Sequence, residues 1–517
     1  MADDVTFYDE IEGYCGELSY VQGDELTLHV SAKTERFDVV IERWGAARTE
    51  VWRSDNVAAV FSPAPGDADS RGCRWPVSLT VEIADSWRSG FYLVTLTAIG
   101  ASDGRNVAHA GFVVRPSRSN RRNDALLVLA TNTWNAYNPW GGCSLYTGAV
   151  EVSFKRPMAR GMLSREPVDR DDRKARPARW GETPDTDGEH FQRYRFANGY
   201  PAAIGSSGWY QYERLFVEWA EAQGIEFDYA ISSDLEDGSV VEGYDQVIGV
   251  GHDEYWSAAQ RDTVEEHVRS GGGYVSFSGN TMFWQVRIEA GPTGPHDTMV
   301  GYKYSAHELD PAIAAGHPES MTGMWADPLV NRPEASFLGG GSAWGLYSRF
   351  GQATARGSGA FTVYRPDHWI FANTGLGYGD LLGQKHGAVG YETLGCRIQF
   401  DEFQQPVRAG GDATPESLEI VAFTPASNCA IGEYPASISA LNDQGDLEFI
   451  ASRIHGGLDK ESLDRARYGN SVIVTCRPFA DEGGEVVAVG TTDWVFGLAD
   501  DPAVAQVTRN ILDYLRR

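Results

Sequence analysis

Cysteine is scarce in this chain and nowhere clustered. The 517 residues contain six cysteines with no Cys-x-x-Cys pair, a pattern that argues against a structural zinc or iron–sulfur site and against a disulfide framework. Free thiols are therefore expected. Any bound metal should have oxygen or nitrogen ligands.

Positive charge is also in short supply. Lys and Arg total 44 against 72 Asp and Glu, which gives a net charge of −28. This excess repels phosphate backbones and anionic lipid, so we exclude nucleic acid as the main partner. No apolar run approaches a membrane span, and the first residues lack the basic and apolar regions of a signal peptide. We therefore expect a cytoplasmic protein with no membrane partner.

The common catalytic signatures are missing as well. The sequence has no Gly-x-Ser-x-Gly elbow followed by a convincing Asp and His, no Walker loop and no His-Glu-x-x-His helix. Cys143 stands in a glycine-rich loop and is a candidate nucleophile, although a single cysteine in such a loop is a common accident.

Short apolar segments separated by turns fill the first part of the chain. Gly-Asp, Pro-rich and Ser-Gly turns divide them, which is typical of an antiparallel β-sandwich. We predict an Ig-like β-sandwich over residues 1–116 and a linker over 117–123. The expected strands are 26–30, 38–41, 77–81, 91–96 and 110–114.

Continuous apolar runs begin at residue 125 and indicate a different kind of sheet. Residues 125–130 are all apolar, as expected for a strand buried on both faces of a parallel sheet. We predict a Rossmann-like (class I glutamine amidotransferase-like) parallel α/β domain over 124–517, so that the fold class is α/β plus all-β. Residues 160–195 should form a long loop. Further strands are expected at 227–231, 419–423, 471–475 and 486–490, and helices at 212–221 and 504–515.

The most informative segment is an apolar run that ends at Gly251 and is followed by His252-Asp253-Glu254. If the extended geometry continues, alternation places His252 and Glu254 on one side and Asp253 on the other. The next helix should begin at Ser257, which forms a capping-box pair with Gln260, and should stop at three consecutive glycines.

A strand that ends in Asn280 follows this helix. Strand, helix and strand in this order form a parallel βαβ unit, so Glu254 and Asn280 should emerge at the same edge of the sheet. Ligands bind at that edge in open α/β sheets.

Five motifs together resemble the catalytic large subunit of N,N-dimethylformamidase from about Asp124 onward. They are Asn135-Ala136-Tyr137, Ser144-Leu145-Tyr146, Gly251-His252-Asp253-Glu254, Ser278-Gly279-Asn280 and Gly390-Tyr391-Glu392. The resemblance implies a mononuclear ferric ion, Fe(III), held by two tyrosinates and a glutamate, and hydrolysis of the amide bond of a small formamide. It implies Tyr137, Tyr146 and Glu254 as metal ligands.

The same resemblance implies that His252 and Asn280 line the pocket and that Glu392 is an acid/base group. A preceding β-sandwich also fits this family. Further candidates for the second phenolate are Tyr194, Tyr200, Tyr210 and Tyr212. The expected partners are a small amide substrate, further copies of this chain in a homo-oligomer, and a small accessory subunit.

Two other hypotheses stay open at this point. One is a hydrolase without iron, with zinc bound by His252 and Glu254 or with Cys143 as nucleophile. The other is a non-catalytic small-molecule or carbohydrate-binding protein, whose 15 Trp and 23 Tyr residues would form stacking surfaces.

Overall fold

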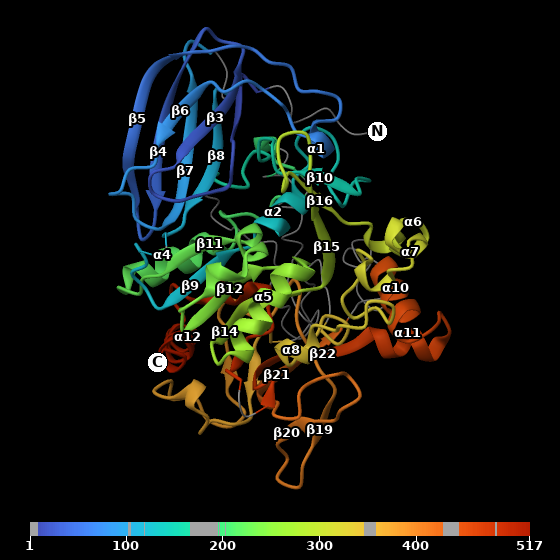
Figure 1. Ribbon diagram of the computed structural model, residues 1–517. Helices are drawn as coiled ribbons and strands as arrows, with labels where there is room; N and C mark the ends of the chain where they lie inside the picture. The colour runs from blue at the N-terminus through green and yellow to red at the C-terminus, as the bar shows by residue number, and fades with distance from the viewer. Residues whose placement is uncertain are drawn as a thin grey trace. The chain divides into compact units, whose positions relative to one another are not determined.

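The computed structural model describes residues 9–101, 105–117, 119–165, 195, 197–201, 203–345, 358–427, 444–480 and 483–516 (Figure 1). These residues fall into two compact units. Unit 1 contains the described residues of Met1–Pro167, Tyr194–Val240 and Val286–Gly301, and unit 2 contains those of Val241–Gln285 and Tyr302–Arg517. The predicted division into 1–116, 117–123 and 124–517 stays a prediction. Most of the predicted loop 160–195 lies outside the described residues.

Two mainly antiparallel sheets lie in the first part of unit 1. One has the order β2-β8-β7-β4-β5 and the other the order β1-β3-β6. Alternate residues of β3 and β4 point inward, so that Leu28, Val30, Val39 and Ile41 share one apolar core. The strands of the first sheet are β2 (Ser19–Tyr20), β8 (Val107–Val114), β7 (Gly90–Ala98), β4 (Arg36–Trp44) and β5 (Arg48–Ala58). Those of the second are β1 (Ile11–Cys15), β3 (Glu25–Ala32) and β6 (Leu79–Glu82).

A parallel strand pair in unit 1 confirms that a different kind of sheet begins after residue 124. β9 (Ala125–Leu129) pairs in parallel with β11 (Asp228–Ile231), and every residue of both strands is buried. Helix α2 (Thr131–Tyr137) follows β9, and α4 (Glu213–Ala222) precedes β11. Unit 1 also contains α1 (Ala68–Arg71), β10 (Glu151–Ser153), η1 (Ser232–Glu236) and β16 (Thr298–Val300).

The sheet of unit 2 is mixed. β12 (Gln246–His252), β14 (Gly273–Gly279) and β23 (Val486–Ala488) are parallel, whereas β22 (Tyr468–Cys476), β21 (Glu419–Ser427), β17 (Phe361–Val363) and β18 (Leu381–Leu382) continue the sheet in antiparallel pairs. The register pairs His252 with Gly279. The carboxyl ends of β12 and β14 are therefore level, as the βαβ pattern predicts.

Helix α5 (Ala258–Arg269) connects these two strands and begins where the sequence predicts. The Gln260 N–H donates to Ser257 Oγ at 3.2 Å, and the Ser257 N–H donates to Gln260 Oε1 at 3.0 Å. Gly271 follows the helix with φ +98°, a conformation that glycine adopts without strain. The closing helix α12 (Pro502–Tyr514) is also confirmed, with Val504, Val507 and Ile511 buried.

The remaining elements are short. Those of unit 2 are β13 (Tyr255–Ser257), η3 (Lys303–Ser305), α6 (Ala306–Leu309), α7 (Pro311–Ala314), η4 (Pro318–Ser320), α8 (Ala335–Leu338), η5 (Trp369–Phe371), β19 (Ile398–Phe400), β20 (Pro406–Arg408), α10 (Gln444–Ile454), α11 (Lys460–Arg467) and η7 (Thr492–Gly497). η2 (Gly238–Val241) and β15 (Trp284–Glu289) have residues in both units. A mixed α/β fold is thus established. Among the described residues, no helix has the length and apolar character needed to cross a membrane.

Candidate metal centre

His252 and Glu254 lie together at the carboxyl end of β12. All residues of this strand are buried, and Gly251 takes φ +79° immediately before the histidine. His252 Nε2 lies 3.4 Å from Glu254 Oε2. Asp253 points elsewhere, since its Oδ1 accepts a hydrogen bond from Trp256 Nε1 at 3.0 Å. The predicted pairing of His252 with Glu254 is therefore confirmed.

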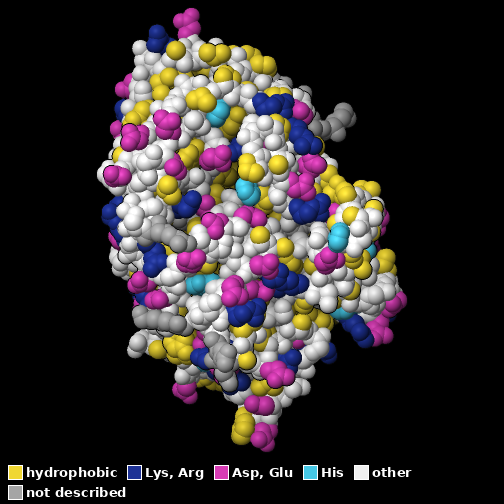
Figure 2. All heavy atoms as spheres, in the orientation of Figure 1, with side chains coloured by type: hydrophobic (Ala, Val, Ile, Leu, Met, Phe, Trp, Pro, Cys, Tyr) yellow, Lys and Arg dark blue, Asp and Glu magenta, His cyan; other side chains and the backbone are white. Residues whose placement is uncertain are grey.

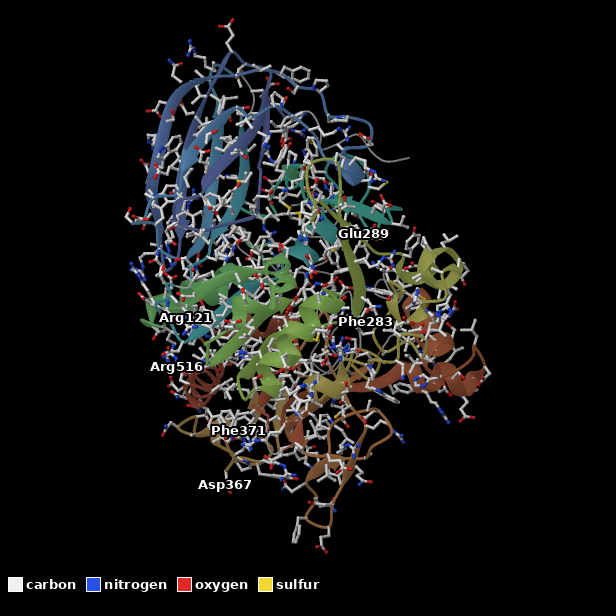
Figure 3. All side chains as sticks on the ribbon, viewed as in Figure 1. Arg121, Phe283, Glu289, Asp367, Phe371 and Arg516 are labelled. Carbon is white, nitrogen blue, oxygen red and sulfur yellow. The ribbon has the colours of Figure 1, made fainter. Side chains whose placement is uncertain are left out.

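Asn280 follows β14 in a left-handed conformation with φ +52°, which asparagine tolerates better than most residues. The preceding Gly279 allows a close approach, because a Cβ atom there would lie 2.2 Å from the Glu392 carbonyl oxygen. The chain then runs beside the segment that follows β12, where the Trp284 N–H donates to the Glu254 carbonyl at 3.0 Å. Phe283, labelled in Figure 3, precedes Trp284 in this turn.

Glu392 comes from a loop that is fixed to the segment after β23. The Thr492 N–H donates to the Glu392 carbonyl at 3.1 Å, and Thr492 Oγ1 donates to the Gly390 carbonyl at 2.9 Å. Tyr391 has φ +53°, an unusual conformation for an aromatic residue. Its ring packs edge-on against the His252 ring at 5.6 Å. Such local strain concentrates at functional sites.

The four predicted residues of unit 2 thus form one buried cluster. Glu392 Oε2 contacts His252 Nε2 and accepts a hydrogen bond from Asn280 Nδ2 at 3.1 Å. None of the four is more than 7% exposed. His252, Glu254 and Glu392 each offer one ligand atom, and these atoms lie within 4.8 Å of one another. An imidazole and two carboxylates suit zinc or iron, so this donor set fits a metal ion.

The two predicted tyrosine ligands lie side by side in unit 1. Tyr137 ends α2, and its ring stacks on that of Tyr146 with centroids 4.2 Å apart. Tyr137 is buried, whereas Tyr146 is 40% exposed. The Leu145 N–H donates to the Ala136 carbonyl at 3.1 Å and joins the two segments. A metal set that combines these tyrosines with Glu254 stays a prediction.

The other tyrosine candidates have different surroundings. Tyr200, Tyr210 and Tyr212 are buried. The Tyr210 ring carries two guanidinium groups within 5 Å of its centroid, those of Arg165 and Arg214. Tyr194 lies outside the described residues. The backbone N–H of the alternative nucleophile, Cys143, donates to Asp69 Oδ2 at 2.7 Å.

Sequence reasoning missed Lys303, a buried lysine of unit 2 that contacts Tyr255, the residue after Glu254. It is 3% exposed, has φ +54°, and its ammonium lies 5.2–5.5 Å from the ring centroids of Tyr255, Trp284 and Tyr304. Such cation–π contacts stabilise a buried charge. Nothing local marks this residue, because lysines are mostly exposed and a lone one suggests a surface position.

The comparison with known families decides the classification. The model described as N,N-dimethylformamidase beta subunit-like, C-terminal, matches residues 38–508. The chain belongs to this family. The resemblance carried by the five motifs is therefore confirmed for nearly the whole chain, including part of the segment before residue 124 in which the sandwich is predicted. Membership of a dimethylformamidase-like family indicates that the protein is an amide hydrolase.

Comparisons with individual proteins add little to the dimethylformamidase-like classification. No curated protein matches the chain. One solved structure is 14% identical to this chain. Its title is "Structural basis of T cell specificity and activation by the bacterial superantigen toxic shock syndrome toxin-1". The match covers 21% of this chain and all of the other, with a TM-score of 0.14. This similarity is too low to carry an argument about fold or function.

Proposed function

We propose that this protein is an iron-dependent amidohydrolase that cleaves the C–N bond of a small or N-substituted amide of the formamide type. The observation that carries the proposal is the buried cluster of His252, Glu254, Asn280 and Glu392 in a member of a dimethylformamidase-like family.

We further infer an Ig-like β-sandwich followed by a Rossmann-like α/β domain. The shared core of the two sheets in unit 1 and the parallel strands β12, β14 and β23 support this arrangement.

The proposed ligands of a single ferric ion are Tyr137, Tyr146 and Glu254. Fe(III) is a hard cation that prefers phenolate and carboxylate oxygen, and the stacked tyrosine rings support a pair of phenol groups that act together. When bound, such an ion supplies Lewis acidity, which polarises a carbonyl and lowers the pKa of a coordinated water.

Glu392 is the proposed general base and acid. In this role its carboxylate takes a proton from the attacking water and returns it to the leaving amine. The Asn280 amide donates to Glu392 Oε2 and so orients the carboxylate, while His252 contacts the same oxygen atom. Burial of the cluster keeps bulk water away from the reacting groups.

Substitution of the proposed ligand Glu254 tests this function. Glu254→Gln should lose iron and turnover of N-substituted formamides together, while the control Glu308→Gln, whose side chain is 63% exposed, should keep both. The measurements are iron per chain and amine release. Full activity with normal iron content in Glu254→Gln would reject the ligand assignment.

A second candidate is a zinc hydrolase whose ligands are His252, Glu254 and Glu392. The compact three-residue donor set favours it. Tyr137→Phe and His252→Gln separate the two candidates. The iron proposal expects Tyr137→Phe to lose metal and His252→Gln to keep it, and the zinc candidate expects the opposite result. A protein that binds no metal in any variant would favour the binding-protein hypothesis.

The proposed partners are a small amide, further copies of this chain and a small accessory subunit. The family description refers to a beta subunit, which supports an assembly of more than one chain.

A further inference from the structure

A β-hairpin with an exposed phenylalanine projects from the sheet of unit 2. We define the arm as residues 397–408, which contain β19 and β20 paired with Phe400 opposite Pro406. In Figure 1 this hairpin extends downward beyond β21 and β22. Within the described chain neither of its strands pairs with a third. The arm is held on the rest of unit 2, since Phe400 contacts the Phe423 ring at 6.1 Å and Arg365 Nη2 donates to the Pro406 carbonyl at 3.2 Å.

Hydrogen bonds fix the tip of the arm and hold Phe403 in solvent. Asp401 Oδ1 accepts from the Phe403 N–H at 2.9 Å and from the Gln405 N–H at 2.8 Å. The Asp401 N–H donates to the Gln405 carbonyl at 3.0 Å, and Gln404 takes φ +60°. The Phe403 residue is 74% exposed in this ordered turn. A preformed conformation lowers the entropic cost of binding.

Phe400 of the arm is part of an aromatic surface, which we define as Tyr364, Tyr378, Phe400 and Phe423. The Tyr364 ring stacks on Phe423 at 4.8 Å and contacts Tyr378 at 5.7 Å and Phe400 at 6.0 Å. Tyr378 is 58% exposed and Phe400 is 50% exposed. Exposed, contiguous aromatic residues are typical of protein–protein contact sites.

Charge indicates which partner this surface suits. The whole chain carries −28, yet the arm carries two arginines, Arg397 and Arg408, and two acids, Asp401 and Glu402, and is neutral. Two copies of this anionic protein therefore repel least where their arms meet. The arginines lie at the base of the arm and the acids at its tip. If two arms packed antiparallel, the acidic tip of each arm would lie beside the two arginines of the other arm.

We propose that the arm and the aromatic surface form an interface between two copies of this chain. The pairing is two-fold: Phe403 of each copy packs on the aromatic surface of the other, and Glu402 faces the arginines at the other arm's base. Figure 2 shows hydrophobic and acidic side chains together at the lower end of the molecule, where the arm projects. This inference rests on the proposed association of copies of this chain and assigns the surface at which they meet, whereas the chemistry proposed for the cluster is independent of it.

Sedimentation of the full chain across a range of concentrations tests the interface. The unmodified chain should associate, and Phe403→Ser should weaken association at least about tenfold, as expected for a central aromatic contact. Phe61→Ser is the matched control, because Phe61 is 59% exposed in unit 1 and should leave association unchanged. Equal thermal melting of both variants would show that the fold is kept.

A charge variant tests the orientation of the two arms. Glu402→Arg places a positive charge at the tip, opposite the arginines of the second copy, and should also weaken association, with a larger effect at low salt. A monomeric unmodified chain, association only with a different co-expressed subunit, or association unchanged in Phe403→Ser would each overturn the proposal.

Discussion

At the scale of the residue, the cluster in unit 2 places two carboxylates and an imidazole in a space that bulk water scarcely enters. Ligand atoms of Glu254 and Glu392 lie within 4.8 Å of each other. Two negative charges at that separation repel by about 3 kcal/mol at an effective dielectric constant near ~20. A metal ion bound by these carboxylates would relieve this repulsion.

Removing the charge of Glu392 should separate catalysis from metal binding. Glu392→Gln keeps the shape of the side chain but provides no proton acceptor, so turnover should fall roughly 10²–10⁴-fold. Iron content and melting temperature should stay within error of the unmodified protein. Loss of the metal with turnover would instead identify Glu392 as a ligand and favour the zinc candidate.

A second buried carboxyl group, Glu334, should make stability depend on pH. Burial raises the pKa of Glu334 from 4.5 to about 7, although its Oε1 accepts the Ser342 N–H at 2.7 Å. The folded state thus holds a proton that the unfolded state releases near pH 4.5. The stability contributed by the protonated group is therefore lost as the pH rises from about 4.5 through 7. The full loss is on the order of 3 kcal/mol.

Glu334→Gln should remove this dependence. Relative to the unmodified protein, the variant should gain roughly 3 kcal/mol of unfolding free energy between pH 4.5 and pH 8, measured by urea denaturation at each pH. The neighbouring charge that acts on Glu334 is that of the Arg261 guanidinium, which lowers its pKa by less than burial raises it. Glu416→Gln, at an exposed position outside the arm, is the control and should show no such gain. Parallel stability curves for Glu334→Gln and the unmodified protein would contradict the assignment.

At the scale of the element, the site depends on close contacts at the ends of strands. Gly279 shows this most directly, because a Cβ there would lie 2.5 Å from the Thr492 nitrogen as well as against the Glu392 carbonyl. Gly279→Ala should destabilise the protein by about 1–3 kcal/mol and displace Glu392, with reduced turnover. Gly66→Ala is the control, since nothing lies within 4 Å of its added Cβ. Equal stability and activity of the two variants would contradict this account.

Elements built from local signals could be predicted from the sequence. The Ser257–Gln260 capping box marks the start of α5, and alternation around His252 places that side chain with Glu254, because both depend on neighbouring residues. The positions of Glu392 and Lys303 depend on contacts between segments far apart in the chain, such as the hydrogen bond from Thr492 to Glu392. Only the family resemblance indicated Glu392, and no signal indicated Lys303.

The antiparallel half of the sheet in unit 2 could not be predicted for a similar reason. The apolar runs of β21 and β22 resemble buried parallel strands, and their direction follows from pairings such as Phe423 with Val472. Periodicity reports burial and not direction, so a mixed sheet and a parallel sheet have the same sequence pattern here.

At the scale of the whole molecule, a strongly anionic chain of the dimethylformamidase-like family carries a buried cluster at a sheet edge and a neutral arm elsewhere in unit 2. The negative charge disfavours anionic partners and is compatible with a neutral amide as substrate. The proposed arm contact would then allow copies of the chain to associate despite their net repulsion.

The central claim is a mononuclear ferric centre with tyrosinate ligands. The most direct test is the metal content of the protein purified without added metal or chelator, together with its visible absorption spectrum. We predict about one iron per chain and a broad phenolate-to-Fe(III) charge-transfer band. Zinc without colour, or protein without metal, would contradict this claim.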